Sequence, residues 1–270
     1  MTARPPSLLR SALTLLSVRL VLTQIGLALL VFLLYAVWLR MPDASVLEVI
    51  GSALLGLTAL AIAGAGESAV ELHLAGRART PGRLVRGTLL LLAGVALWLA
   101  WSALIGHWRG DYNRNDVTVA GYLNSRLPHQ LRYIFTFEHI LMWVGRTWAT
   151  LAWIGAGVIA LFVFTATASA KPVRAIVVAA RSVTYWAAVV LGAAGATVGT
   201  SSLLDWTPGH GLRVELMSLG LRLGLATLID AMLVCFLLAT LAACVRRVDA
   251  LYTTPAGTPD ESQPRTVDKL

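Results

Sequence analysis

One acidic residue stands in the middle of a long apolar run. Asp230 is preceded by Leu-Ala-Thr-Leu-Ile and followed by Ala-Met-Leu-Val-Cys, in the last of six such runs. An ionisable group at bilayer depth costs about 3 kcal/mol or more unless it is paired, protonated or hydrated. We therefore expect Asp230 either to pair with a polar group on another helix or to face a path for protons or ions.

Two arginines lie within the apolar runs as well. Arg146 and Arg222 fall in the outer halves of the fourth and sixth runs, where they could share a polar cluster with Thr147, Thr150 or Ser218. The partners predicted for Asp230 come from the inner halves of the first and fifth runs, and they are Arg19, Gln24, Arg181 and Tyr185. As structural pairs, such contacts fix helix register and contribute about 0.6 kcal/mol each.

A second acidic group follows the Gly64-Ala-Gly66 end of the second run. Glu67 and Glu71 are four residues apart and His73 comes next, so the three side chains could hold a metal ion or shuttle protons. The alternative, which we favour, is an interfacial turn whose acids pair with nearby arginines at little net gain. An intramembrane enzyme that uses these three residues remains one functional hypothesis.

Composition and run length determine the elements that must position these residues. The chain has 270 residues, of which 57% are hydrophobic and only 13% charged, which excludes a water-soluble domain. A helix needs about 20 mostly apolar residues to cross the hydrocarbon core, with its backbone groups bonded internally. We therefore predict an all-α bundle of six transmembrane helices within one domain, residues 1–250, with spans at 11–39, 46–66, 87–106, 140–170, 176–204 and 215–245. None of the six runs is conspicuously short or interrupted.

The basic residues predict the orientation of this bundle. They gather before the first span, between the second and third, around the start of the fifth, and after the sixth. In a six-span bundle all four groups fall on one side, which the positive-inside rule makes the cytoplasm. Both termini are then cytoplasmic, and the charge of +8 reflects topology and contact with anionic lipid, with no nucleic-acid partner. Only Lys171 and Lys269 are lysines among 22 basic residues, a bias typical of GC-rich bacteria, so we expect a bacterial inner-membrane protein.

Two segments lie outside the spans in this prediction. Residues 107–138 form the longest outer connection, and leucines at four-residue spacing in its second half predict an amphipathic helix that Pro128 interrupts. Trp98, at the end of the third span, belongs to the aromatic residues expected at the outer interface. Residues 251–270 are polar and too poor in apolar surface to fold, so we expect a disordered cytoplasmic tail.

Glycines predict where helices touch. Gly195 and Gly199 on the fifth span, and Gly220 and Gly224 on the sixth, have the GxxxG spacing that lets backbones approach closely. Together with Gly192 they predict tight packing of these two spans, or a dimer. Cys235 and Cys244 are nine residues apart on one helix, about 13 Å, too far for a disulfide.

No enzymatic template is complete in this sequence. It has no HExxH, GxSxG, Walker or CxxC motif, and we predict no cofactor. The leading hypothesis is a non-enzymatic structural, accessory or assembly component that acts by helix packing, with membrane lipids, a homo-oligomer or a membrane protein as partners. The competing hypothesis is a small secondary transporter or channel with a polar site around Asp230, Arg222 and Arg146.

Overall fold

The fold is a bundle of long helices. A computed structural model describes residues 7–41, 44–205 and 211–253, and within these ranges it contains helices and turns but no β-strand. Six helices are long and apolar enough to cross a membrane, which confirms the predicted all-α polytopic architecture; they are Val18–Trp38, Val46–Leu74, Pro81–Asp111, Phe137–Ala168, Val183–Leu203 and Arg213–Leu251. Most of the predicted tail, residues 254–270, lies outside the described residues.

The predicted first span is two helices. α1 (Leu8–Leu15) is separated from α2 (Val18–Trp38) at Ser17, whose extended backbone and side chain cap α2 by accepting a hydrogen bond from the Leu20 amide. α1 packs against the end of α10 (Leu212–Thr253), where Ala12 is fully buried beside Ala239 and Ala243. The break at Ser17 therefore makes the start of the predicted span a separate short helix, which packs on α10.

α3 (Val46–Leu74) extends past the predicted end at Gly66. A capping box between Ser45 and Glu48 begins the helix, and Gly76, with φ of 71°, follows its end. The last turns stay helical because Leu72 and Leu74 are buried in the core. The prediction of an interfacial turn for Glu67, Glu71 and His73 was therefore wrong, since all three lie on a membrane helix.

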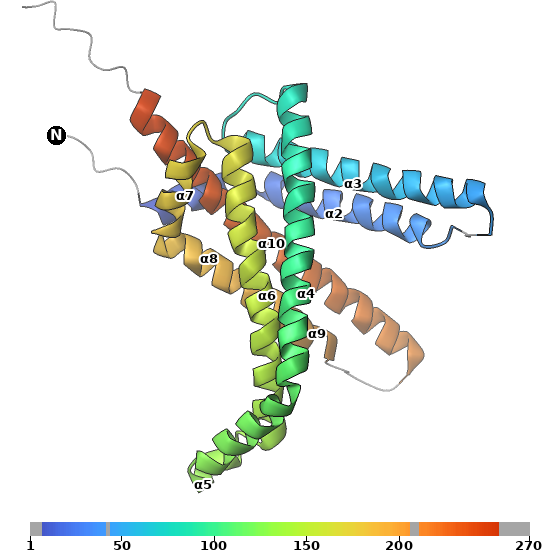
Figure 1. The fold of residues 1–270 in the computed structure, drawn as a ribbon, viewed down its shortest axis with the longest axis vertical. Helices are drawn as coiled ribbons and strands as arrows, with labels where there is room; N and C mark the ends of the chain where they lie inside the picture. The colour runs from blue at the N-terminus through green and yellow to red at the C-terminus, as the bar shows by residue number, and fades with distance from the viewer. Residues whose placement is uncertain (1–6, 42–43, 206–210, 254–270) are drawn as a thin grey trace, which may run out of the picture.

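α4 (Pro81–Arg126) is one continuous helix of 46 residues. The predicted outer connection, residues 107–138, is therefore helical as far as Arg126. α4 packs side by side with α6 (Phe137–Ala168), and Asp116 is buried where the Trp148 indole donates to it at 3.4 Å, which supports the helix beyond the predicted span (Figure 1). The chain turns at Pro128, as predicted, through the short α5 (His129–Arg132).

The predicted fifth span is interrupted, contrary to the sequence-based expectation of an unbroken run. It consists of α7 (Pro172–Ala180), α8 (Val183–Ala194), the π-helical segment η1 (Gly195–Gly199) and α9 (Thr200–Asp205). Ser182 starts α8 by accepting a hydrogen bond from the Tyr185 amide. π-Helical segments are rare and often occur at functional sites.

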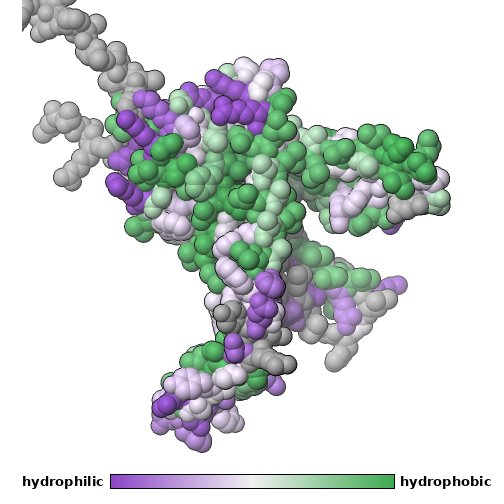
Figure 2. Space-filling view, in the orientation of Figure 1, coloured by the Kyte–Doolittle hydropathy of each residue, from purple (hydrophilic) through white to green (hydrophobic). Residues whose placement is uncertain are grey.

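The basic groups gather at one end of the molecule. Arg77, after α3, forms an ion pair of 2.6 Å with Asp249 on α10 and donates to the Ala168 carbonyl at the end of α6. Arg246 on α10 donates to the Leu74 carbonyl at 2.7 Å. Hydrophilic surface covers this end, around α7 and the start of α4, and also the opposite end around α5, whereas the α2–α3 hairpin is largely hydrophobic (Figure 2). The α2–α3 hairpin and the first half of α10 diverge from the α4–α6 pair (Figure 1).

Candidate functional site

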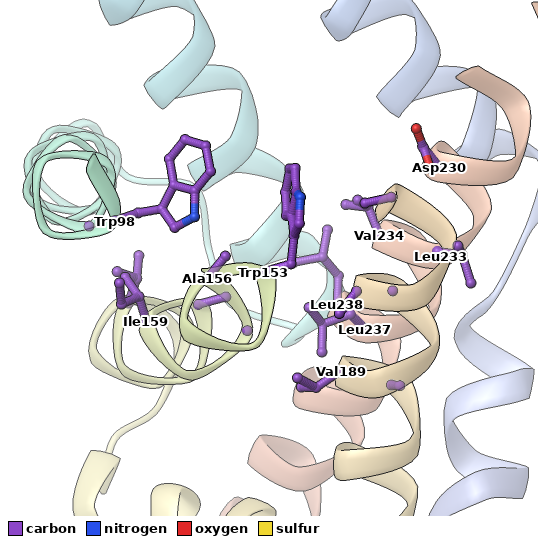
Figure 3. A pocket seen from close by; sticks show the side chains of 18 of the residues that line it. Trp98, Trp153, Ala156, Ile159, Val189, Asp230, Leu233, Val234, Leu237 and Leu238 are labelled. Atoms are coloured by element: carbon purple, nitrogen blue, oxygen red, sulfur yellow. The ribbon is translucent and has the colours of Figure 1, made fainter. Parts of the chain in front are cut away.

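A cavity of about 530 Å³ lies between the helices that cross the centre of the bundle. Its wall is formed by α3, α4, α6, α8, η1, α9 and α10, and most of it is apolar. Trp98 on α4 and Trp153 on α6 lie on one side of the cavity. Asp230 and Val234 on α10 lie on the other side (Figure 3). A volume of this size is within the range of small-molecule sites, roughly 300 to 1,000 Å³.

Three carboxyl groups line this cavity: Glu67 and Glu71 from α3, and Asp230 from α10. Glu67 and Glu71 share one face of α3 because residues four apart are neighbours on a helix. The sequence placed the two glutamates and Asp230 in separate candidate sites. The structure brings them to one cavity, and no Lys, Arg or His of the described ranges belongs to its lining.

Glu67 has a polar partner on the neighbouring helix. The Gln24 side-chain amide on α2 donates to both carboxyl oxygens of Glu67, at 3.1 and 3.0 Å. Gln24 is itself buried, 9% exposed, so this contact fixes the register of α2 against α3 inside the bundle. The sequence-based prediction was a contact of Gln24 with Asp230, whereas the structure shows its contact with Glu67.

Glu71 is the most deeply buried acid of the cavity. Its side chain is 3% exposed, and its carboxyl interacts with the Thr167 hydroxyl on α6. Its Oε2 atom has no hydrogen-bond partner among the described residues. A buried polar atom without a partner is costly and calls for a specific explanation, such as a ligand, an ion or water.

His73 does not join the two glutamates. It is exposed and absent from the cavity lining. Within the described ranges, no group of three or more His, Cys, Asp and Glu side chains could hold a metal ion. The structure thus separates His73 from Glu67 and Glu71, which stay together in the cavity wall.

Asp230 is bonded to a residue that sequence analysis did not name. The Thr200 hydroxyl, at the start of α9, lies 3.2 Å and 3.4 Å from the two carboxyl oxygens. Arg19 and Arg181 are exposed. Tyr185 is fully buried and donates instead to the Gly157 carbonyl at 3.0 Å. The π-helical segment η1 comes directly before Thr200 in the interrupted fifth run, and the Thr200 hydroxyl faces α10.

The two arginines of the predicted polar site lie outside the cavity lining. Arg146 donates to the Ser201 hydroxyl at 3.3 Å, and its guanidinium stacks over the Trp143 ring at 5.4 Å. Arg222 is buried and donates to the backbone carbonyl of Ser218 on its own helix. The cavity wall that includes Asp230 therefore includes Glu67 and Glu71 but not Arg146 or Arg222.

Of the five glycines predicted to pack helices, the structure places only Gly195 in close contact with another helix. A Cβ atom there would clash with the Leu233 side chain on α10. Nothing lies within 4 Å of a Cβ built at Gly192, Gly199, Gly220 or Gly224. The close approaches occur elsewhere, for example where Gly94 meets Val163 and Gly157 meets Val189. GxxxG spacing did not identify them because it gives no information about which helix face is covered.

Two tryptophans form an aromatic part of the wall. The rings of Trp98 and Trp153 are 5.5 Å apart between centroids and inclined by 41°. The Trp98 indole nitrogen has no hydrogen-bond partner among the described residues. Sequence analysis had assigned Trp98 to the outer interface, and the length of α4 places it inside the span instead.

The cavity is open to the surface. Three of its lining residues keep a large exposed fraction: Val95 (47%), Trp153 (42%) and Val234 (45%). Each stands near the midpoint of its candidate span, Pro81–Asp111, Phe137–Ala168 and Arg213–Leu251 respectively.

No protein-family model, curated protein or solved structure matches the chain. The fold itself defines the class, an all-α polytopic membrane protein with six candidate spans.

Proposed function

We propose that the chain is a small carrier that takes molecules from the bilayer into its intramembrane cavity and binds them there. The observation that carries this proposal is the position of three acids, Glu67, Glu71 and Asp230, in the wall of a cavity that opens at mid-span. Intramembrane acids that face a cavity typically mark the pathway of a substrate or ion.

This proposal is a revised form of the transporter hypothesis. The alternative, a component that acts by helix packing, would place Asp230 in a dry contact between helices. Asp230 does hydrogen-bond across to Thr200, but it also lines the cavity, which favours a binding role. Exposure of His73, away from the cavity, gives no support to an enzyme that uses it with Glu67 and Glu71.

We further propose that the protein lies in the bacterial cytoplasmic membrane with both termini in the cytoplasm. The contacts of Arg77 and Arg246 support this orientation, because they gather basic residues at one end of the bundle. Membrane lipids are the surroundings that such a fold requires, and a homo-oligomer or a membrane protein partner is compatible with the diverging α2–α3 hairpin.

Entry into the cavity can be tested with a small, neutral, lipid-soluble aryl diazirine. After photolysis in nanodiscs, we expect covalent labelling of Val189 and Leu238, which are buried in the bundle and line the cavity. The fully buried Leu241, which does not line it, should stay unlabelled. Peptide mass spectrometry measures the three sites.

The matched variants are Gly192→Phe and Gly199→Phe. Both glycines have open space around a built Cβ, but only Gly192 lines the cavity. Gly192→Phe should fill the cavity and lower labelling of Val189 and Leu238 severalfold, whereas Gly199→Phe should leave it unchanged. Labelling of Val189 and Leu238 no stronger than that of Leu241 in the unmodified protein would refute the proposed function.

A further inference from the structure

We infer that the ligand of the cavity is an amphiphilic organic cation: an ammonium group attached to an apolar body of small-molecule size. This inference rests on the proposed function and specifies its substrate class. Four properties of the cavity support it: its charge, the buried carboxyl of Glu71, the apolar lining and the aromatic wall.

The ionisable side chains of the lining are all acidic in the described part of the chain. Glu67, Glu71 and Asp230 contribute three carboxyl groups, and none of the described basic residues lines the same cavity. In a medium of low dielectric constant, carboxyl groups without basic partners favour a ligand that brings a positive charge. An anionic ligand would find no positive charge among the described lining residues.

Glu71 is the residue that we assign to the cationic head group. Gln24 already donates to both oxygens of Glu67, and Thr200 donates to Asp230. By contrast, Glu71 is 3% exposed, lines the cavity, and has an Oε2 atom without a partner in the described part of the chain. An ammonium group would supply both the missing hydrogen bond and the counter-charge.

The rest of the lining distinguishes an organic cation from a metal ion. Calcium and magnesium need about six or more oxygen ligands, and in the described residues no cluster of acidic, histidine or cysteine side chains could hold a metal. Leu237, Leu238 and Val189 are typical of the wall, which is mostly hydrocarbon. An apolar ligand body that comes from lipid would pack against this wall without losing hydration, because the lipid tails that it leaves are equally apolar.

The aromatic wall serves the apolar body of the ligand. Trp98 and Trp153 pack together at 5.5 Å in the lining, and Trp153 lies about 21 Å along α6 from Thr167, the residue beside Glu71. The rings would therefore contact the tail of a ligand whose head group is held at Glu71. The cavity is also about 15 Å long on α6, between Trp153 and Val163, which gives room for an extended tail.

The test compares three ten-carbon compounds that differ only in their head group: decylamine, decanol and decanoate. Each competes with the aryl diazirine for labelling of Val189 and Leu238 in nanodiscs, at concentrations corrected for its measured partitioning into lipid. At neutral pH the alkylamine is protonated, as a lysine side chain is, and decanoate is ionised. We expect decylamine to halve the labelling at a concentration at least tenfold lower than decanol, with decanoate weakest.

Two variants assign the effect to Glu71. Glu71→Gln should remove most of the tenfold advantage of decylamine over decanol. Glu48→Gln is the control, since Glu48 is a partly exposed residue at the other end of α3, outside the cavity lining, and glutamine preserves its capping role. Loss of the advantage in both variants alike would refute the assignment to Glu71.

The outcomes separate this inference from the function on which it rests. If the unmodified protein is labelled and decylamine, decanol and decanoate compete equally, the cavity binds apolar molecules and the inference of a cationic ligand is wrong. If decanoate competes best, the charge preference is reversed and the inference is equally wrong. If Val189 and Leu238 are not labelled at all, the proposed function itself fails.

Discussion

Asp230 accepts a hydrogen bond and also faces the cavity. Both features determine how much its carboxyl group contributes to the stability of the fold. A carboxyl buried in a dry helix contact needs its partner to offset the cost of leaving water, so loss of the partner is expensive. Asp230 is only partly buried and accepts its hydrogen bond from a neutral hydroxyl, that of Thr200. The contact should therefore contribute little to stability and leave the carboxyl available to a ligand.

At the residue scale we predict a weak coupling between Asp230 and Thr200. Thr200→Val and Asp230→Leu should be non-additive by about 0.6 kcal/mol, the mean value for hydrogen bonds between membrane helices. Asp230→Asn should be milder than Asp230→Leu because an amide oxygen still accepts from Thr200. The unfolding free energy in mixed micelles, titrated with dodecyl sulfate, measures each variant.

The control for this cycle is Thr227→Val. Thr227 is exposed, and its hydroxyl donates to the Leu223 carbonyl of its own helix. It should show no coupling to Asp230→Leu. Strictly additive effects of Thr200→Val and Asp230→Leu would show that the hydrogen bond contributes nothing.

At the element scale, the interrupted fifth run has the largest influence on the site. η1 widens the helix between Ala194 and Thr200. The hydroxyl of Thr197, within η1, and that of Thr200, directly after it, face two different helices. Thr197 contacts Thr150 on α6 at 3.2 Å, while Thr200 reaches Asp230 on α10. A regular helix advances about 100° per residue, so removal of the π-helical turn would rotate Thr200 relative to α10.

Close packing of this segment on α10 gives a prediction about two glycines. Gly195→Leu should destabilise the protein by about 1 to 3 kcal/mol because the new side chain overlaps Leu233. Gly220→Leu should have almost no effect, since nothing lies within 4 Å of its Cβ position. Thermal unfolding in detergent measures both variants, and an equal loss for Gly220→Leu would mean that a second chain covers α10.

At the scale of the whole molecule, the long helices extend beyond the bilayer. α4 has 46 residues and α10 has 42, about 69 Å and 63 Å at 1.5 Å per residue, against a hydrocarbon core of about 30 Å. The ends of α3, α6 and α10 meet around Arg77 and Arg246, whereas the end of α4 and α5 lie at the opposite end of the bundle (Figure 1). In the proposed orientation the two ends of the protein face different compartments.

The topology predicts which engineered cysteines a membrane-impermeant maleimide reaches. Gln130→Cys, in α5, should react in intact spheroplasts, and Ala78→Cys, after α3, should react only after permeabilisation. Both positions are exposed, and the native Cys235 and Cys244 are buried, so the background should be low. Equal reaction of the two positions before permeabilisation would contradict the proposed orientation.

The sequence by itself determined the class of fold and the number of spans. Run length and composition are local properties, and the bilayer requires each apolar segment to satisfy its own backbone hydrogen bonds, so each span is visible without knowledge of its neighbours. The ends of the spans were less certain, because burial of Leu72 and Leu74 extends α3 and Ser17 divides the first run. The importance of Asp230 as a candidate was likewise readable from its apolar surroundings.

Only the tertiary structure decided which residues form the site. Glu71 and Asp230 lie on helices far apart in the chain, and no local pattern encodes which faces of α3 and α10 border one cavity. The partner of Asp230 depended on η1, and the contact of Gly195 on the position of Leu233. The physical reason is that in lipid the hydrophobic effect does not sort helix faces into inside and outside, so packing between particular side chains determines the arrangement.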